Sequence, residues 1–302
     1  MKRRWKKLTA LTVAAVMGVA SVPMTAVPRQ VDAAEMLSQS DIEREISFNK
    51  GWKFFLEQEG SIDASGKDYD DSGWRNVDLP HDYSIEQGFD PNSPGTANGG
   101  YINGGVGWYR KTFVLPKEMA GKRISINFGG IYMDSTTYVN GKMVGNYPYG
   151  YSPFSYDITD FVKADGVTEN VISIKVNHQQ PSSRWYSGSG IYRNVDLVVT
   201  DPVHVARYGT YVTTPDLEQE YKNNRAKVHA ETKVENESAD DAQIKVRTTI
   251  FDDKGQVFKE AETTEEQTIK AGETVTFTQD IATGKPELWD TENPNLYEVK
   301  TE

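Results

Sequence analysis

Tyr138-Val139-Asn140-Gly141-Lys142-Met143-Val144 is the stretch that decides the fold of the first half of this chain. It sets an Asn-Gly pair between two apolar segments. A two-residue type I′ turn needs positive φ at both central positions, and Asn and Gly adopt such angles most easily. The stretch therefore predicts a β-hairpin and, with it, an antiparallel sheet.

The surrounding sequence repeats this β signal. Apolar and polar residues alternate in segments 124–128 and 172–176, and such alternation predicts strands with one buried face. Residues 45–200 are rich in aromatic residues and glycine, and no part of them sustains an amphipathic helical period. We expect a β-sandwich there. Its core is expected to contain Trp52, Trp74 and Trp108.

The composition changes after Asp201-Pro202, because aromatic residues become sparse and Lys, Glu and Thr dominate. Alternating segments at 228–234 and 244–250 are separated by turns that carry Asp, Lys and Gly. Short strands of this kind predict a small immunoglobulin-like sandwich. Pro202 marks the boundary, since proline ends a strand and restricts the residue before it. Residues 287–299 run towards a strand that is expected to be cut short.

The N-terminus has the pattern of a secretory signal peptide. Five basic residues within 2–7 precede the apolar run 8–22, and the small-residue stretch Val31-Asp32-Ala33-Ala34 follows. A positive start, an apolar middle and small residues at the exit are typical of a cleaved leader. A retained membrane anchor is the alternative. We expect a leader over residues 1–34, a secreted or cell-surface protein, and no membrane span after cleavage.

The charge and composition exclude several classes of partner and cofactor. The formal net charge is −11, and the first 34 residues carry six basic residues against one Asp, so the exported part is near −16. An acidic, unpatterned surface argues against nucleic acid. The chain has no cysteine, which removes disulfides and thiolate metal sites. No cofactor is expected.

No metal site is predicted either. His81, His178, His204 and His229 show no ligand spacing. The acidic run 68–73 resembles a calcium loop only superficially, since Leu79 stands where the bidentate Glu would be required. The run is interpreted as a solvated turn.

Several strings in order carry a resemblance to a known family. They are Leu79-Pro80-His81-Asp82-Tyr83, Gly107-Trp108-Tyr109-Arg110-Lys111-Thr112-Phe113, Tyr138-Val139-Asn140-Gly141, Arg184-Trp185-Tyr186-Ser187-Gly188-Ser189-Gly190-Ile191-Tyr192-Arg193-Asn194-Val195, and Leu288-Trp289 with Asn295-Leu296-Tyr297. The chain resembles the N-terminal part of glycoside hydrolase family 2 enzymes, and its motifs are most similar to those of the bacterial β-galactosidases. The resemblance implies a sugar-binding, galactose-binding-domain-like jelly roll over 45–201 and a truncated immunoglobulin-like domain over 202–302.

The resemblance also implies where catalysis occurs. In the family, a (β/α)8 barrel further along the chain carries the general acid/base Glu and the nucleophile Glu. A barrel needs about 250 residues of alternating strand and helix, which this sequence does not contain. The two carboxyl groups of a retaining glycosidase must lie about 5 Å apart across the sugar. We therefore expect no catalytic residue in this chain, and no hydrolysis by it alone.

Arg184, Trp185 and Tyr186 are the first candidates for sugar contact. The family's loop reaches into the barrel from this place, and some relatives have Asp where Arg184 stands. Aromatic rings stack on the apolar side of a sugar, and Arg can donate to its hydroxyls. The alternative is structural, with Arg184 paired to a surface carboxylate and an aromatic residue filling the core.

Asp82 and Asn103 complete the predicted substrate-binding set. Asp82 faces the same site in one interpretation and bonds its own backbone in the other, since Asp is a common turn former. Asn103 lies in the glycine-rich loop 99–107, which is otherwise a flexible lip.

Three classes of function remain open after these observations. The first is the accessory part of a β-galactosidase, with a β-galactoside and the enzyme's own barrel as partners. The second is a free carbohydrate-binding module. The third is the same pair of domains from a β-glucuronidase or a β-mannosidase.

Overall fold

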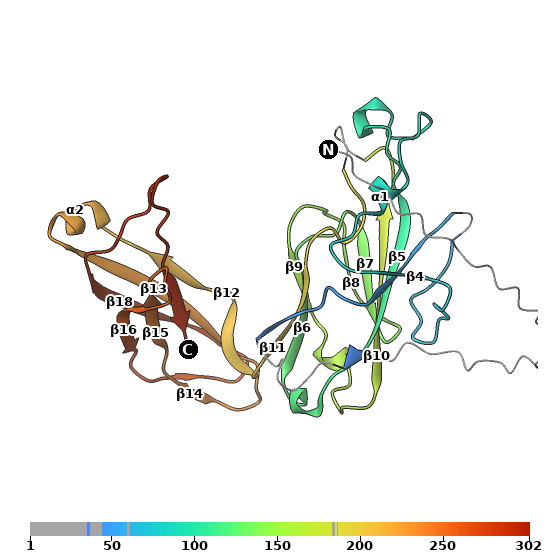
Figure 1. Cartoon of the computed structure of the whole chain (residues 1–302). Coiled ribbons are helices and arrows are strands. Elements are labelled where there is room, and N and C mark those ends of the chain that lie inside the picture. The colour runs from blue at the N-terminus through green and yellow to red at the C-terminus, as the bar shows by residue number, and fades with distance from the viewer. Residues whose placement is uncertain (1–34, 37–43, 59–60, 183–184, 186) are drawn as a thin grey trace, which may run out of the picture. The chain divides into compact units, whose positions relative to one another are not determined.

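β-Strands are the main regular structure of the described chain, as a computed structural model shows for residues 35–36, 44–58, 61–182, 185 and 187–302 (Figure 1). The predicted leader, Arg184 and Tyr186 lie outside these residues. The described residues contain two short α-helices, α1 (Tyr83–Glu86) and α2 (Leu217–Lys222). No helix in the described ranges is long and apolar enough to cross a membrane.

Two sheets form the first sandwich. The larger has the order β4 (Arg75–Val77), β3 (Trp52–Leu56), β5 (Gly105–Val114), β10 (Glu169–His178), β7 (Ser135–Val139), β8 (Lys142–Tyr147), and β1 (Glu35–Met36) pairs in parallel with β5. The smaller has the order β2 (Glu45–Ser47), β11 (Val195–Thr200), β6 (Arg123–Phe128), β9 (Phe154–Asp157). Among the residues that the structure describes, 3-10 turns lie at η2 (Ala97–Gly99), η3 (Lys117–Met119) and η4 (Thr159–Phe161). The expected all-β jelly roll is confirmed.

The Asn-Gly hairpin forms where it was predicted. Asn140 and Gly141 have φ of 49° and 80° and join β7 to β8. The Asn140 side chain also accepts from the backbone N–H of Val171 at 2.9 Å, which ties the turn to β10. The turn thus fixes both the hairpin and its place in the larger sheet.

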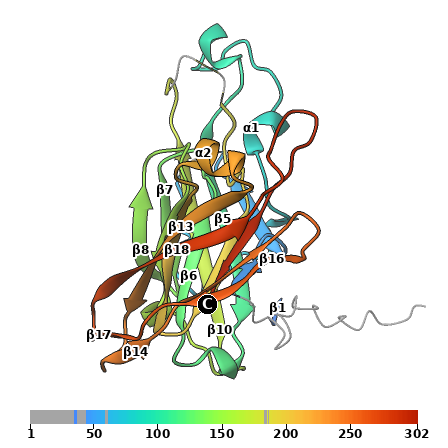
Figure 2. The same cartoon turned by 90° about the vertical axis from the view of Figure 1, so that its left-hand side faces the viewer.

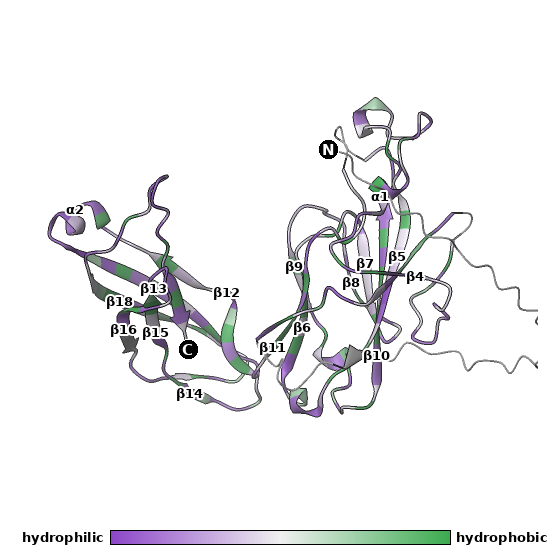
Figure 3. Cartoon of the chain, viewed as in Figure 1, coloured by the Kyte–Doolittle hydropathy of each residue, from purple (hydrophilic) through white to green (hydrophobic). Residues whose placement is uncertain are grey.

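The core lies between the two sheets, and hydrophobic and hydrophilic residues alternate along the strands (Figure 3). In β6 every second residue is buried, as the sequence predicted. In β10 the alternation is incomplete, because Val171 and Ser173 on the opposite face are buried too. Ser173 Oγ donates to the Ala64 carbonyl at 2.8 Å, so the segment after β3 covers this face.

The tryptophan expectation is only partly correct. Trp52 is fully buried and Trp108 is 2% exposed. Trp74 is half-buried instead, because it lies in the bend just before the short strand β4 and stacks on Phe55 with ring centroids 5.6 Å apart. Trp74 therefore lies outside the fully buried core.

The acidic run 68–73 is not simply a solvated turn. Asp71 forms ion pairs with Lys53 at 2.8 Å and with Arg110 at 2.9 Å. The Arg110 guanidinium is 1% exposed and also donates to the carbonyls of Ala64, Gly66 and Lys67. A buried cation requires an opposite charge and carbonyl acceptors, and this segment provides both.

Three smaller sheets form the second sandwich (Figure 2). Their orders are β12 (Val203–Thr213), β13 (Arg225–Asn236), β18 (Thr274–Gly284); β16 (Val257–Thr263), β15 (Arg247–Phe251), β19 (Glu298–Thr301); and β14 (Ala242–Ile244), β17 (Gln267–Ile269). Val234, Val246, Ile269 and Phe277 form a buried cluster. This agrees with the predicted immunoglobulin-like architecture.

Two details of the second sandwich differ from the pattern in the sequence. The alternating segment 244–250 is divided, since β14 ends at Ile244 and β15 begins at Arg247. The terminal strand β19 is paired with β15, and Arg247 and Glu302 exchange two backbone hydrogen bonds of 2.8 Å. The domain limits at 201 and 202 stay a prediction.

Candidate functional site at the loop end of the jelly roll

Three chain segments meet at one end of the jelly roll: the start of α1, the glycine-rich loop before β5, and the segment that follows β10. Backbone hydrogen bonds join the first to the third. His81 N donates to Ile191 O at 2.8 Å, and Tyr83 N donates to Ser189 O at 2.9 Å. The predicted sugar-contacting residues all belong to these three segments.

Asp82 links α1 to the segment after β10. Its Oδ1 accepts from Ser84 N at 2.9 Å, which caps α1, and from Ser189 N at 2.8 Å. A Cβ at residue 188 would lie 2.0 Å from Asp82 Oδ2, so only glycine fits there. Asp82 therefore forms the local turn that the structural interpretation foresaw. Its contact with a sugar stays a prediction.

His178, the last residue of β10, bonds both ends of the segment that carries Trp185. The ring is 1% exposed. Its Nε2 lies 3.0 Å from Ser182 Oγ, and its Nδ1 is hydrogen-bonded to Ser189 Oγ. One rigid ring thus fixes the points at which the segment leaves and rejoins the jelly roll.

The neighbouring hydroxyls determine which nitrogen of His178 carries the proton. Ser84 Oγ donates its hydrogen to the Asn103 carbonyl at 2.8 Å. In its contact with Ser84, the Ser189 hydroxyl must therefore be the donor. Ser189 Oγ is then left to accept from His178 Nδ1–H, and His178 Nε2 accepts from Ser182. The network requires a hydrogen on His178 Nδ1, which in a neutral ring is the Nδ1–H tautomer.

The electrostatics of His178 agree with this assignment. Burial lowers the pKa of His178 to about 4, although the nearby Asp82 carboxylate opposes the shift. The imidazole is therefore uncharged at neutral pH. Protonation would add a hydrogen at Nε2 and force the Ser182 hydroxyl to turn.

Gln180 holds the glycine-rich loop against the same segment. Its Oε1 accepts from Gly104 N at 2.9 Å, and its Nε2 donates to Ile102 O at 2.9 Å. Asn103, between these residues, donates from Nδ2 to Asp90 Oδ2 at 3.1 Å. That bond lowers the pKa of Asp90. The loop is thus fixed by specific hydrogen bonds rather than being a flexible lip.

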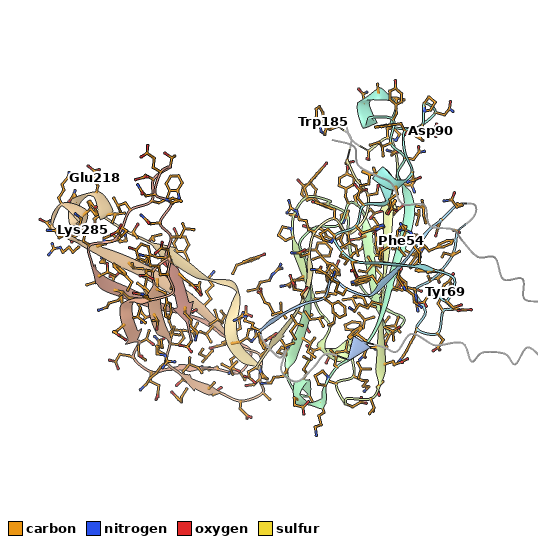
Figure 4. All side chains as sticks on the ribbon, viewed as in Figure 1. Phe54, Tyr69, Asp90, Trp185, Glu218 and Lys285 are labelled. Atoms are coloured by element: carbon orange, nitrogen blue, oxygen red, sulfur yellow. The ribbon has the colours of Figure 1, made fainter. Side chains whose placement is uncertain are left out.

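The structure places Asp82 and Asn103 around one hydrogen-bond network, with Trp185 on the adjoining segment. Trp185 is 66% exposed, so it does not fill the core. Figure 4 shows Trp185 and Asp90 at the same end of the jelly roll. Arg184 and Tyr186 lie outside the described residues, and their roles stay predictions. Within the described ranges, no group of three His, Asp or Glu side chains could hold a metal ion.

Sequence reasoning missed His178, Ser189 and Gln180. His178 continues the period of the inward-facing residues Ile172, Ile174 and Val176, so a buried histidine could have been inferred. Its partner Ser189 could not, because Ser189 lies across a loop and takes part in a network with Ser84, which is 105 residues away from Ser189.

Comparison with known proteins identifies the family. Residues 47–202 match the sugar binding domain of glycosyl hydrolases family 2, and residues 203–302 match a further region of that family. Both sandwiches match models of this family, so the chain belongs to glycoside hydrolase family 2. The described part of it contains no catalytic barrel.

The relatives include enzymes of two specificities. The chain is 42% identical to the β-galactosidase BoGH2A of Bacteroides ovatus over 84% of its own length and 29% of that protein. It is 30% identical to a β-glucuronidase of Formosa agariphila, over 84% of its length and 27% of that protein. The chain thus spans less than a third of these curated relatives.

Solved structures agree with this assignment. A family 2 glycosyl hydrolase from Bacteroides cellulosilyticus matches with a TM-score of 0.79 and 35% identity, over 86% of this chain and 33% of that one. A family 2 β-glucuronidase matches with a TM-score of 0.76 and 30% identity, over 85% of this chain and 28% of that one.

Proposed function

We propose that this chain is the front part of a longer β-galactosidase-type glycoside hydrolase, in which it supplies one side of the substrate site and a scaffold. The 42% identity to a β-galactosidase carries the proposal. The gathering of Asp82, Asn103 and Trp185 at one end of the jelly roll supports it. A sugar bound there would meet an exposed indole and fixed polar loops, while the reacting carboxyl groups come from the barrel.

A β-glucuronide is the second candidate substrate, and Arg184 is the observation that favours it. A guanidinium can only donate, and it pairs in a two-pronged manner with a carboxylate. A glucuronide carries such a carboxylate, whereas a galactoside presents hydroxyls. β-Glucuronidases are also among the relatives.

The test compares this chain with a longer form that extends through the barrel. We expect the chain alone to hydrolyse neither lactose nor an aryl β-galactoside above background, because it lacks the carboxyl pair. The longer form should prefer the aryl β-galactoside to the aryl β-glucuronide by at least about tenfold in kcat/KM. The reverse preference would assign the site to glucuronides. Turnover by the chain alone would refute the proposal that the catalytic carboxyl groups come from the barrel.

We also propose that the protein is secreted or displayed at the cell surface. The basic residues, apolar run and small-residue exit of the first 34 residues support this. N-terminal sequencing of exported material is expected to begin near Ala34. Met1 at the N-terminus of that material would contradict the proposal.

A further inference from the structure

A second recess lies on the jelly roll, apart from the loop segment that carries Trp185. It is a cleft of about 390 Å³ formed by β3, the start of β4 and α1, lined among others by Phe54, Phe55, Trp74, Arg75, Glu86 and Gln87. Figure 4 shows Phe54 in the middle of the jelly roll and Trp185 at its end. We propose that this cleft is a second carbohydrate site, which takes one neutral pyranose ring.

The inner surface of the cleft is aromatic. Trp74 stacks on Phe55 at an interplanar angle of 23°, and Tyr83 stacks on Phe54 with centroids 5.3 Å apart. Phe54 and Tyr83 belong to the buried core, whereas Trp74 and Phe55 are only half-buried. The apolar face of a pyranose can stack on partly exposed aromatic rings, and the buried rings beneath hold these in a fixed orientation.

Polar groups at the rim come from β4 and α1. Arg75 is ion-paired with Glu86, and its Nη2 lies 3.0 Å from His81 Nε2. Gln87 donates from Nε2 to Gly104 O at 3.0 Å and to Asn103 O at 3.2 Å. The described residues provide no donor to its Oε1. The rim thus offers a carboxylate, a guanidinium and an amide oxygen, which are complementary to sugar hydroxyls.

The charges at the rim favour a neutral ligand. Among the described residues that line the cleft, Arg75 is the only cation, and Glu86 already neutralises it. Burial also lowers the pKa of the adjoining His81, so its ring adds no positive charge at neutral pH. The carboxylate of a uronic acid would be desolvated in the cleft without an unpaired cation to bind it. A neutral hexopyranoside has no charge to desolvate.

The cleft goes beyond the proposed function, because that function rests on Asp82, Asn103, the loop segment and the barrel, and on none of the rings of the cleft. Both ends of the loop segment are fixed through His178, whereas the cleft depends on Trp74 and on the Arg75–Glu86 pair. Variants can therefore separate the two sites.

The experiment titrates methyl β-galactoside, methyl β-glucoside and glucuronate into the full chain, followed by NMR of the indole N–H signals. A shallow site for one ring is expected to bind the neutral glycosides with Kd of about 1–10 mM and glucuronate at least about fivefold more weakly. Glu86→Gln and Trp74→Ala should each raise Kd at least about fivefold. Trp185→Ala, an exposed aromatic of the loop segment, should leave Kd unchanged.

Three other outcomes would each contradict the proposed sugar site in the cleft. Loss of binding in Trp185→Ala, with Glu86→Gln and Trp74→Ala unaffected, would place the sugar at the loop segment and leave the proposed function intact. Glucuronate binding as tightly as the neutral sugars would contradict the charge argument. No saturable binding up to about 50 mM would refute the site, while hydrolysis by the longer form would still test the proposed function. Glu86 is half-exposed, so its variant is expected to fold even if Trp74→Ala does not.

Discussion

Replacing Arg184 by alanine in a longer form that carries the barrel is expected to lower kcat/KM for an aryl β-galactoside by about 30- to 1000-fold. This corresponds to about 2–4 kcal/mol of transition-state stabilisation, the size of a charged hydrogen bond to a sugar hydroxyl in an enclosed site. The melting temperature should hardly change, because Trp185 beside it is exposed and the segment is held at its ends by Ser182 and Ser189.

Arg184→Lys is the matched control. It keeps the positive charge but loses the planar fork, so a role in orienting a hydroxyl or a carboxylate should leave Lys clearly weaker than Arg. Comparing galactoside with glucuronide in both variants shows which substrate the guanidinium serves. Unchanged kinetics in Arg184→Ala would assign the residue to surface ion pairing instead.

Replacing His178 by alanine is expected to destabilise the jelly roll by about 2–4 kcal/mol at pH 7. The change leaves a cavity at a 1% exposed site and removes the donor to Ser189 and the acceptor for Ser182. His178→Asn keeps an amide N–H near the position of Nδ1 and should recover part of this loss. Chemical denaturation of the three proteins measures the difference.

The same residue is expected to make stability depend on pH. The pKa of His178 is about 4 in the folded protein, against 6.5 for an unperturbed histidine. As the pH falls through this range, His178 becomes protonated in the unfolded chain but stays neutral in the folded protein. The stability contribution is therefore present above pH 6.5 and is lost between pH 6.5 and 4, up to about 3 kcal/mol.

A second histidine provides the control for this pH dependence. The pKa of His229 is raised, chiefly by its hydrogen bond to Asp280. Its contribution to stability therefore has the opposite pH dependence and increases as the pH falls. His178→Asn should flatten the fall in stability between pH 6.5 and 4, whereas His229→Asn should retain it. An unchanged slope in His178→Asn would mean that His178 is not held neutral by burial.

Local pattern and tertiary contacts contributed differently to the substrate-binding set. The turn-forming tendency of Asp82 was visible in the sequence, but its second hydrogen bond reaches Ser189, 107 residues away. Trp74 and Trp108 look alike in the sequence, yet Trp74 is only half-buried and Trp108 is fully buried. Residue type alone does not say which side of a strand, or which end of it, another segment will cover.

The sequence by itself determined the all-β class, the hairpin at Asn140-Gly141 and the order of the two sandwiches. These follow from periods of two residues and from turn angles, which are properties of a few neighbouring residues. Only the tertiary structure decided that Arg110 is a buried cation paired with Asp71, and that His178 bonds Ser182 and Ser189. The free energy of a buried polar group depends on the partners that the fold brings to it, and those partners come from distant strands and loops.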